Sequence, residues 1–139
     1  RPPLPADPQA LVRLLTEEVE EAGRTIEALV EMGASVIPYL PDRVDEGHGL
    51  NREAIESLRA QSVSLLVTVD CGSSSVEEVE TARSMGMDTI VTDHHEPPTG
   101  DLPPAVAIVN PKLHDSEYPF RELCGGAVAF MYRFRPFDG

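Results

Sequence analysis

The sequence predicts an α/β fold in which a mostly parallel sheet is flanked by helices. Two observations predict it: helix-like and strand-like segments alternate, and the strand-like segment at residues 63–69 is apolar almost throughout. Alternation is typical of βαβ units, and near-continuous apolarity is typical of strands buried on both faces. With 139 residues and 41% hydrophobic residues, the chain is long and apolar enough for one domain with a real core.

The N-terminal part is predicted to be helical after a proline-rich start. Residues 9–33 carry apolar positions at helical spacing, with Gly23 inside the stretch and Gly33 as a stop signal. The next segment, ASVIPYL at residues 34–40, predicts a short strand limited by its prolines.

The remaining elements follow in regular alternation. A helix is predicted over residues 51–61, where Asn51 can cap the first turn, and a second over residues 75–86, closed by Gly86. The predicted strands are residues 63–69 (VSLLVTV), 88–92 (DTIVT) and 105–110 (AVAIVN). Since strands and helices alternate, the strands are expected to run parallel.

Two of the predicted strands end at an aspartate. Asp70 follows VSLLVTV, and Asp93 follows DTIVT and precedes His94 and His95. Ligands of open parallel sheets bind beyond the carboxyl ends of the strands, so we expect Asp70 and His94 to lie within reach of one ion. Carboxylate and imidazole groups suit Mn²⁺ or a similar metal. For Asp70 alone, the role of a turn or helix-cap residue fits equally well.

The residues after Asp70 predict a tight exit from the strand. Gly72 is followed by three serines, Ser73, Ser74 and Ser75. One of these serines can cap the following helix, and the N–H groups of the turn favour an anion. A phosphate group would suit this position.

The formal net charge of −13 restricts the partners of the chain. An acidic surface repels phosphate backbones, so a nucleic-acid surface must be local, metal-assisted or supplied elsewhere. The acidic runs at residues 16–21 and 76–80 are interpreted as solvated helix faces. No stretch is long enough to span a membrane, and the start does not resemble a signal peptide, which predicts a cytoplasmic location with both cysteines reduced.

The aspartate and histidine segments resemble a known family. VTVDCG (67–72) and TIVTDHHEPP (89–98) resemble the second and third motifs of the DHH phosphoesterases, and among these the RecJ-type exonucleases are most similar. Residues 36–51 and 102–130 are similar to the segments that flank these motifs. The resemblance implies a partial DHH domain over residues 26–132, with an atypical N-terminal lead and helix at 1–25 and an irregular end at 133–139.

What the resemblance implies is a two-metal phosphodiester hydrolysis with Mn²⁺ or Mg²⁺. It places Asp70, Asp93, His94 and His95 in the catalytic machinery, with Asp70 and His94 as metal ligands. His95 would face the metal or the scissile phosphate, and Asp93 would orient the cluster from behind.

The resemblance also suggests residues that contact the substrate, which would be single-stranded DNA or a short oligonucleotide. They are Arg43, His95 and the glycine pair Gly125 and Gly126, at which a helix starts. For Arg43, a surface ion pair with a neighbouring aspartate fits the sequence equally well.

One motif of the family is missing. Members carry an Asp-x-Asp-Gly turn after a first strand, whereas residues 9–25 read QALVRLLTEEVEEAGRT and suggest no strand. The expected function is therefore a RecJ-like 5′ to 3′ exonuclease, impaired in this chain. The alternatives are a silent DHH-fold interaction scaffold, or a small DHH phosphoesterase acting on short oligonucleotides.

Two further expectations concern association and metals. If a missing first strand is central in the sheet, unpaired edges favour self-association or a partner chain. A structural zinc site using Cys71, His94 and Cys124 is disfavoured, because no pair has Cys-x-x-Cys spacing.

Overall fold

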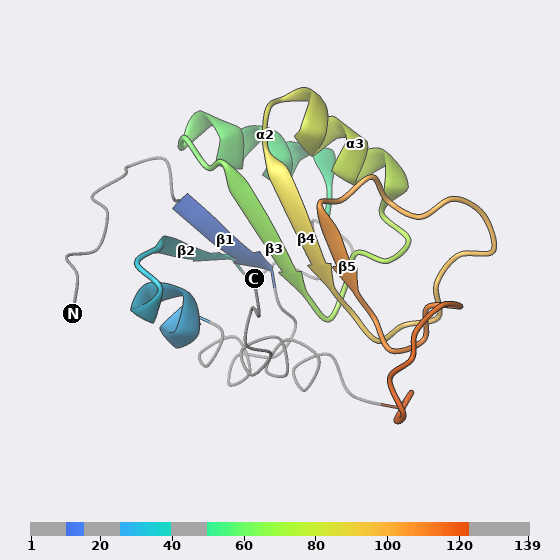
Figure 1. Cartoon of the computed structure of the whole chain (residues 1–139). Helices are drawn as coiled ribbons and strands as arrows, with labels where there is room; N and C mark the ends of the chain where they lie inside the picture. The colour runs from blue at the N-terminus through green and yellow to red at the C-terminus, as the bar shows by residue number, and fades with distance from the viewer. Residues whose placement is uncertain (1–10, 16–25, 40–49, 123–139) are drawn as a thin grey trace.

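The computed structural model describes residues 11–15, 26–39 and 50–122 (Figure 1). They form a five-stranded, all-parallel sheet in the order β2-β1-β3-β4-β5. The strands are β1 (Leu11–Leu15), β2 (Ser35–Tyr39), β3 (Leu65–Val69), β4 (Asp88–Thr92) and β5 (Ala107–Val109). The helices are α2 (Arg52–Ala60), α3 (Val76–Ser84) and a helical segment at residues 26–31. The predicted α/β fold is confirmed.

The prediction of a helix over residues 9–33 is wrong at its start, because Leu11–Leu15 form strand β1. This strand lies between β2 and β3 and pairs with both, with Leu15 opposite Tyr39 and Thr68. A short apolar run fits a helix face and a buried strand equally well, and pairing with distant strands decides between them. The first strand is therefore present, and the expectation of edges left unpaired by its loss is also wrong.

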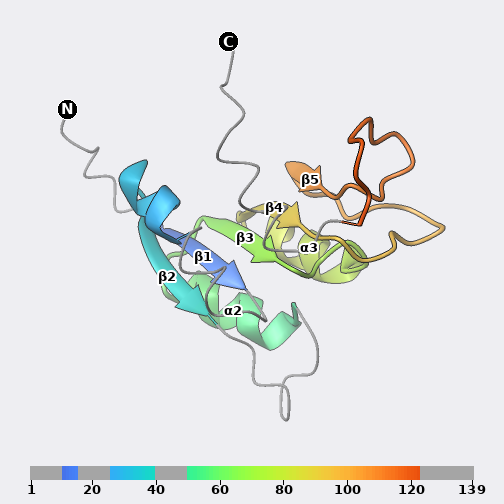
Figure 2. The same ribbon diagram turned by 90° about the horizontal axis from the view of Figure 1, so that it is seen from below.

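The strand order reverses beside β1. The chain passes from β1 to β2 on one side and then returns to β3 on the other side. Helices α2 and α3 lie on one face of the sheet, and the helical segment 26–31 lies on the opposite face (Figures 1 and 2). In open parallel sheets, a crevice forms at the carboxyl ends of the strands where the order reverses. Strand β3 borders this point.

Strand β3 is packed on both faces. Leu66 contributes to the core under α2 and α3, which also contains Leu58 and Val79. Val67 and Val69 form the opposite core, against which Ile26 and Leu29 of the helical segment and several strand side chains pack. Because successive side chains of a strand point to opposite faces, a nearly continuous apolar run fits this position, and Thr68 is its one polar residue. The predicted two-sided burial of this strand is confirmed, since Leu66 to Val69 are buried.

Strand β2 carries a proline without leaving the sheet. Pro38 lies within β2, opposite Leu14 of β1. Since β2 is an edge strand, one of its sides has no ladder to interrupt, and proline is tolerated there. Within the residues that the structure describes, no helix has both the length and the apolar character that a membrane crossing requires.

Helices α2 and α3 differ in how their first turns are capped. Asn51 caps α2, because its side-chain oxygen accepts a hydrogen bond of 2.8 Å from the Ala54 N–H, as predicted. Ser75 is the N-cap of α3, but its side chain makes no capping hydrogen bond. The predicted serine cap of this helix is therefore wrong for Ser75.

This difference supplies a matched pair of substitutions. We expect Asn51→Ala to lower the free energy of unfolding by about 1 kcal/mol, because a first-turn N–H loses its acceptor. Ser75→Ala is the control and is expected to change the stability by less than about half of that. Urea unfolding of both variants measures the effect, and equal losses would contradict the assigned cap.

Candidate metal centre

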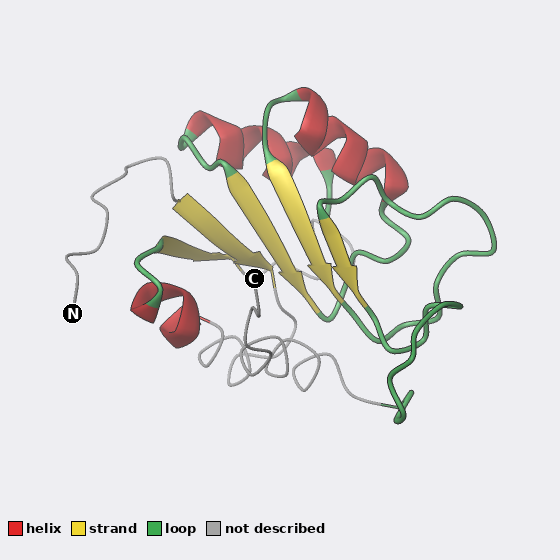
Figure 3. Ribbon diagram, in the orientation of Figure 1, coloured by secondary structure: helices red, strands yellow, loops and turns green. Residues whose placement is uncertain are grey.

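The candidate site lies at the carboxyl edge of the sheet, where the strands β3 and β4 end (Figure 3). Asp70 follows β3 directly, and Asp93, His94 and His95 follow β4. Val69 lies opposite Thr92 in the parallel register, so the two loops leave the sheet at the same level. The backbone N–H of Asp70 donates a hydrogen bond of 2.9 Å to the Thr92 carbonyl and extends the pairing by one residue.

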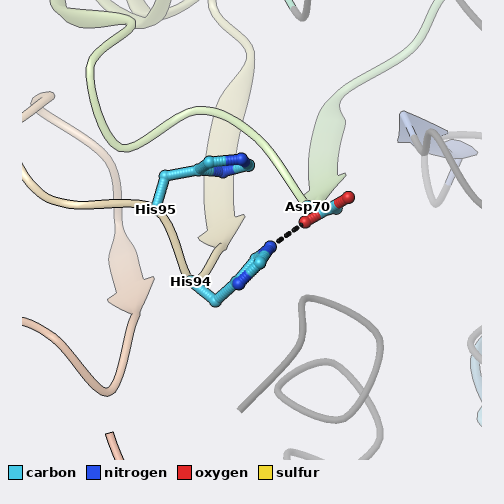
Figure 4. Close-up of side chains that lie close together, drawn as sticks. All are labelled: Asp70, His94 and His95. Carbon is cyan, nitrogen blue, oxygen red and sulfur yellow. Dashed lines mark ion pairs between the residues drawn. The ribbon is translucent and has the colours of Figure 1, made fainter. Parts of the chain in front are cut away.

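Asp70 has an unusual backbone conformation. Its φ of 66° lies in the left-handed region, which is uncommon for residues other than glycine. Such conformations cluster at functional sites, where the surrounding structure maintains them. The turn directs the carboxylate toward His94, whose Nε2 lies 2.5 Å from Asp70 Oδ1 (Figure 4).

Three side chains converge on one point. Asp70, His94 and His95 each offer a ligand atom, and these atoms lie within 4.8 Å of one another. The two histidine rings are 4.6 Å apart between centroids and tilted by 45°. The side chains of Asp70 and His94 are 12% and 30% exposed. Asp70 and His94 are partly shielded, whereas His95 is exposed, and one carboxylate with two imidazoles suits a divalent cation such as Mn²⁺.

Asp93 lies behind this group and is 2% exposed. Its Oδ1 accepts hydrogen bonds from the backbone N–H of His94 at 2.8 Å and of His95 at 3.2 Å. The same oxygen lies 2.6 Å from Nδ1 of the His95 ring, and Oδ2 accepts a bond of 3.0 Å from the Ser73 N–H. Asp93 is thus placed to fix the tautomer and orientation of His95, which is how carboxylates support metal-binding histidines.

Opposing effects act on the pKa of Asp93. Burial raises this pKa, but hydrogen bonds from Ser73 and His95 lower it more, so the net pKa lies below its ordinary value of 3.8. The hydrogen bonds favour the ionised form that the histidines require.

The lowered pKa gives a pH-dependent prediction for Asp93→Asn. A carboxyl whose pKa is lower in the folded state stabilises the fold above its unfolded pKa, and this stabilisation is lost as the pH falls through the folded pKa. We expect the variant to be less stable by roughly 2 kcal/mol at pH 7 and the difference to shrink below about pH 4. Urea unfolding at both pH values tests this, and a gap of equal size at low pH would refute it.

The loop after β3 binds the carboxylate of Asp93, which takes the place of an external anion. The sequence suggested a phosphate at the N–H groups after Gly72, but the Ser73 N–H already donates to Asp93 Oδ2. Gly72 has a φ of 109°, and a Cβ there would lie 2.9 Å from Thr68 Oγ1. Glycine is therefore required where the loop passes over β3.

Two buried residues of the site were missed from the sequence. Asn110, which follows β5, donates from Nδ2 to Ser73 Oγ and to the His95 carbonyl, both at 2.9 Å. The sequence indicates Ser73 only as a helix cap or as a donor to an anion. Asn110 ends the predicted strand AVAIVN at the same sheet edge as Asp70 and Asp93, and this position is the signal that could have identified it.

Some predicted residues lie outside the described part of the chain. Arg43, Gly125, Gly126 and Cys124 belong to this group. Their predicted roles stay predictions.

A family model described as DHH family, N-terminal domain matches residues 9–136. The chain belongs to the DHH family. The matched range includes β1 and the residues that follow it, although the Asp-x-Asp-Gly sequence expected of the family's first motif is missing there.

Curated relatives of this DHH chain include exonucleases. The single-stranded-DNA-specific exonuclease RecJ of Bacillus subtilis (strain 168) is 45% identical over 105 residues, which cover 76% of this chain and 13% of the relative. RecJ of Escherichia coli (strain K12) is 49% identical over 105 residues, covering 74% of this chain and 18% of the relative. The chain thus spans less than a fifth of the length of these relatives.

Solved structures of RecJ share the DHH fold of this chain. A crystal structure of exonuclease RecJ bound to manganese superposes with a TM-score of 0.76 at 28% identity, covering 88% of this chain and 32% of the other. RecJ from Thermus thermophilus in complex with Mn²⁺ gives a TM-score of 0.62 at 27% identity, covering 95% of this chain and 21% of the other.

Proposed function

We propose that this chain forms part of the metal-binding core of a RecJ-like exonuclease, which hydrolyses phosphodiester bonds of single-stranded DNA from the 5′ end. The observation that carries the proposal is the convergence of Asp70, His94 and His95 at the sheet edge. The similarity to exonucleases that act on single-stranded DNA, and to RecJ structures that hold manganese, supports the choice of substrate and metal.

In this proposal, Asp70 and His94 hold a divalent ion, and His95 faces the ion or the scissile phosphate. A divalent ion held there would activate a water molecule for attack and would offset the charge that develops on the phosphoryl oxygens. Asp93 holds His95 through its ring nitrogen and its backbone N–H. Because Asp93 is buried, it is placed to keep the His95 ring in one orientation.

The ligand set of the described residues suits one ion better than two. A hard divalent ion takes about six ligands, and two ions need several protein carboxylates. In residues 11–15, 26–39 and 50–122, the group within 4.8 Å contains a single carboxylate, that of Asp70. Since the sequence also lacks Asp-x-Asp-Gly, we propose that this chain holds one ion and that two-metal hydrolysis is impaired without further carboxylates.

The missing motif also favours a second candidate, a DHH-fold interaction scaffold without turnover. A small DHH phosphoesterase acting on short oligonucleotides is the enzymatic variant. Both hypotheses predict results that differ from those of the exonuclease hypothesis in the following experiment. If the exonuclease hypothesis holds, DNA repair or recombination in the cytoplasm is the expected setting.

The test is a Mn²⁺ titration by calorimetry, paired with a cleavage assay on 5′-labelled single-stranded DNA and on a dinucleotide. His94→Ala should lose the ion, whereas His114→Ala removes an exposed histidine outside the cluster and should bind as the unmodified chain does. Binding of one ion with slow, Mn²⁺-dependent cleavage of DNA supports the exonuclease. Cleavage of the dinucleotide alone supports the small phosphoesterase, and no binding with no cleavage supports the scaffold.

A further inference from the structure

We infer that Asn110 is a positioning residue of the metal centre, which holds the backbone carbonyl of His95 while Asp93 holds the backbone N–H and the ring of the same residue. This inference rests on the proposed function, because the placement of His95 affects metal binding only if the metal centre exists. Asn110 follows β5, two strands away from Asp70. It does not belong to the group of convergent ligand atoms.

The Asn110 side chain uses both of its N–H donors and its carbonyl oxygen at the site. Nδ2 donates to Ser73 Oγ and to the His95 carbonyl, both at 2.9 Å, and Oδ1 accepts from the Lys112 N–H at 2.9 Å. The residue is 4% exposed. An amide is suited to this place because it donates two bonds and accepts one, which neither a carboxylate nor a hydroxyl does.

The four residues form a closed circuit of hydrogen bonds. Asn110 donates to the Ser73 side chain, the Ser73 N–H donates to Asp93, the Asp93 carboxylate holds the His95 ring, and the His95 carbonyl accepts from Asn110. His95 is therefore held at its ring and at its carbonyl by partners from different strand ends. Because its side chain is 58% exposed, packing alone does not fix it. The circuit supplies the constraint that burial does not.

Two substitutions at Asn110 separate the effect of its hydrogen bonds to Ser73 and His95 from the effect of its side-chain volume. Asn110→Ala removes all three bonds, and Asn110→Asp keeps the shape and the acceptor for Lys112 but cannot donate to the His95 carbonyl. Thr89→Val is the matched control, because Thr89 is a buried residue of β4 whose Oγ1 has no hydrogen-bond partner among the described residues. It changes a buried polar group of the same sheet without breaking a bond.

Three quantities are measured: Mn²⁺ affinity by calorimetry, the ring ¹⁵N signals of His95 in the metal-free chain, and the melting temperature. We expect both Asn110 variants to bind Mn²⁺ about 10- to 100-fold more weakly, as is typical for loss of a residue that orients a ligand. The His95 signals should shift as well, whereas Thr89→Val should match the unmodified chain in both. If Asn110→Ala fails to fold, Asn110→Asp decides.

Unchanged Mn²⁺ affinity and unchanged His95 signals in Asn110→Asp would overturn the inference, and so would equal effects in Thr89→Val. A different result, obtained with the unmodified chain, would contradict the proposed function. If the unmodified chain does not bind Mn²⁺, the metal assignment falls. The His95 ring signals of the metal-free variants then still decide whether Asn110 positions this ring.

Discussion

Replacing Gly72 with alanine is expected to lower the free energy of unfolding by about 3 kcal/mol. A side chain at a φ of 109° is strained, which costs on the order of 1 to 3 kcal/mol. The added Cβ would also lie 2.9 Å from Thr68 Oγ1 and 3.2 Å from Val91, within buried surroundings. Forcing an extra methyl group into such a place costs a similar amount.

Gly86→Ala separates the two contributions. Gly86 also has a positive φ, 77°, but nothing lies within 4 Å of a Cβ at this position. We expect a loss of about 1 kcal/mol from the backbone alone. Urea unfolding of both variants gives the comparison, and a Gly72→Ala variant no less stable than Gly86→Ala would show that the loop can move away from β3.

Removing the Asp70 carboxylate is expected to weaken Mn²⁺ binding by at least about 100-fold, more than the loss of a residue that only orients a ligand. The backbone conformation adds a second expectation. At a φ of 66°, Asp70→Gly relieves the backbone and Asp70→Ala does not. Both variants lack the carboxylate, so we expect the glycine variant to be the more stable of the two by about 1 kcal/mol.

Calorimetry with Mn²⁺ and thermal unfolding without it test these expectations. Asp88→Ala is the control for charge, because Asp88 is an exposed residue of β4 outside the ligand group. Equal stabilities of the Asp70→Gly and Asp70→Ala variants would contradict the strained backbone. Unchanged Mn²⁺ binding in both would remove Asp70 from the site.

The sequence predicted the parts of the fold that depend on local signals. The nearly continuous apolar run of β3 and the cap at Asn51 could be recognised because each is determined by neighbouring residues. The juxtaposition of Asp70 and His94 followed from a topological rule for parallel sheets, together with their place after consecutive strands.

The missed features depend on residues that are distant in the chain. Leu11–Leu15 becomes a strand through pairing with β2 and β3, which the local pattern does not contain. The anion at Ser73 proved to be the carboxylate of Asp93, 20 residues further along. Asn110 is 37 residues from Ser73, and no local sequence pattern predicts the hydrogen bond between their side chains.

The packing of β3 on both faces also determines when the site is lost during opening of the fold. Buried central strands exchange their amide hydrogens most slowly, because exposing them requires most of the domain to unfold. β3 is paired on both edges, and the bond from the Asp70 N–H to Thr92 extends the ladder into the site. Asp70, the proposed carboxylate ligand, is therefore attached to the strand that we expect to open last, whereas Asn110 follows the edge strand β5, which we expect to open earlier.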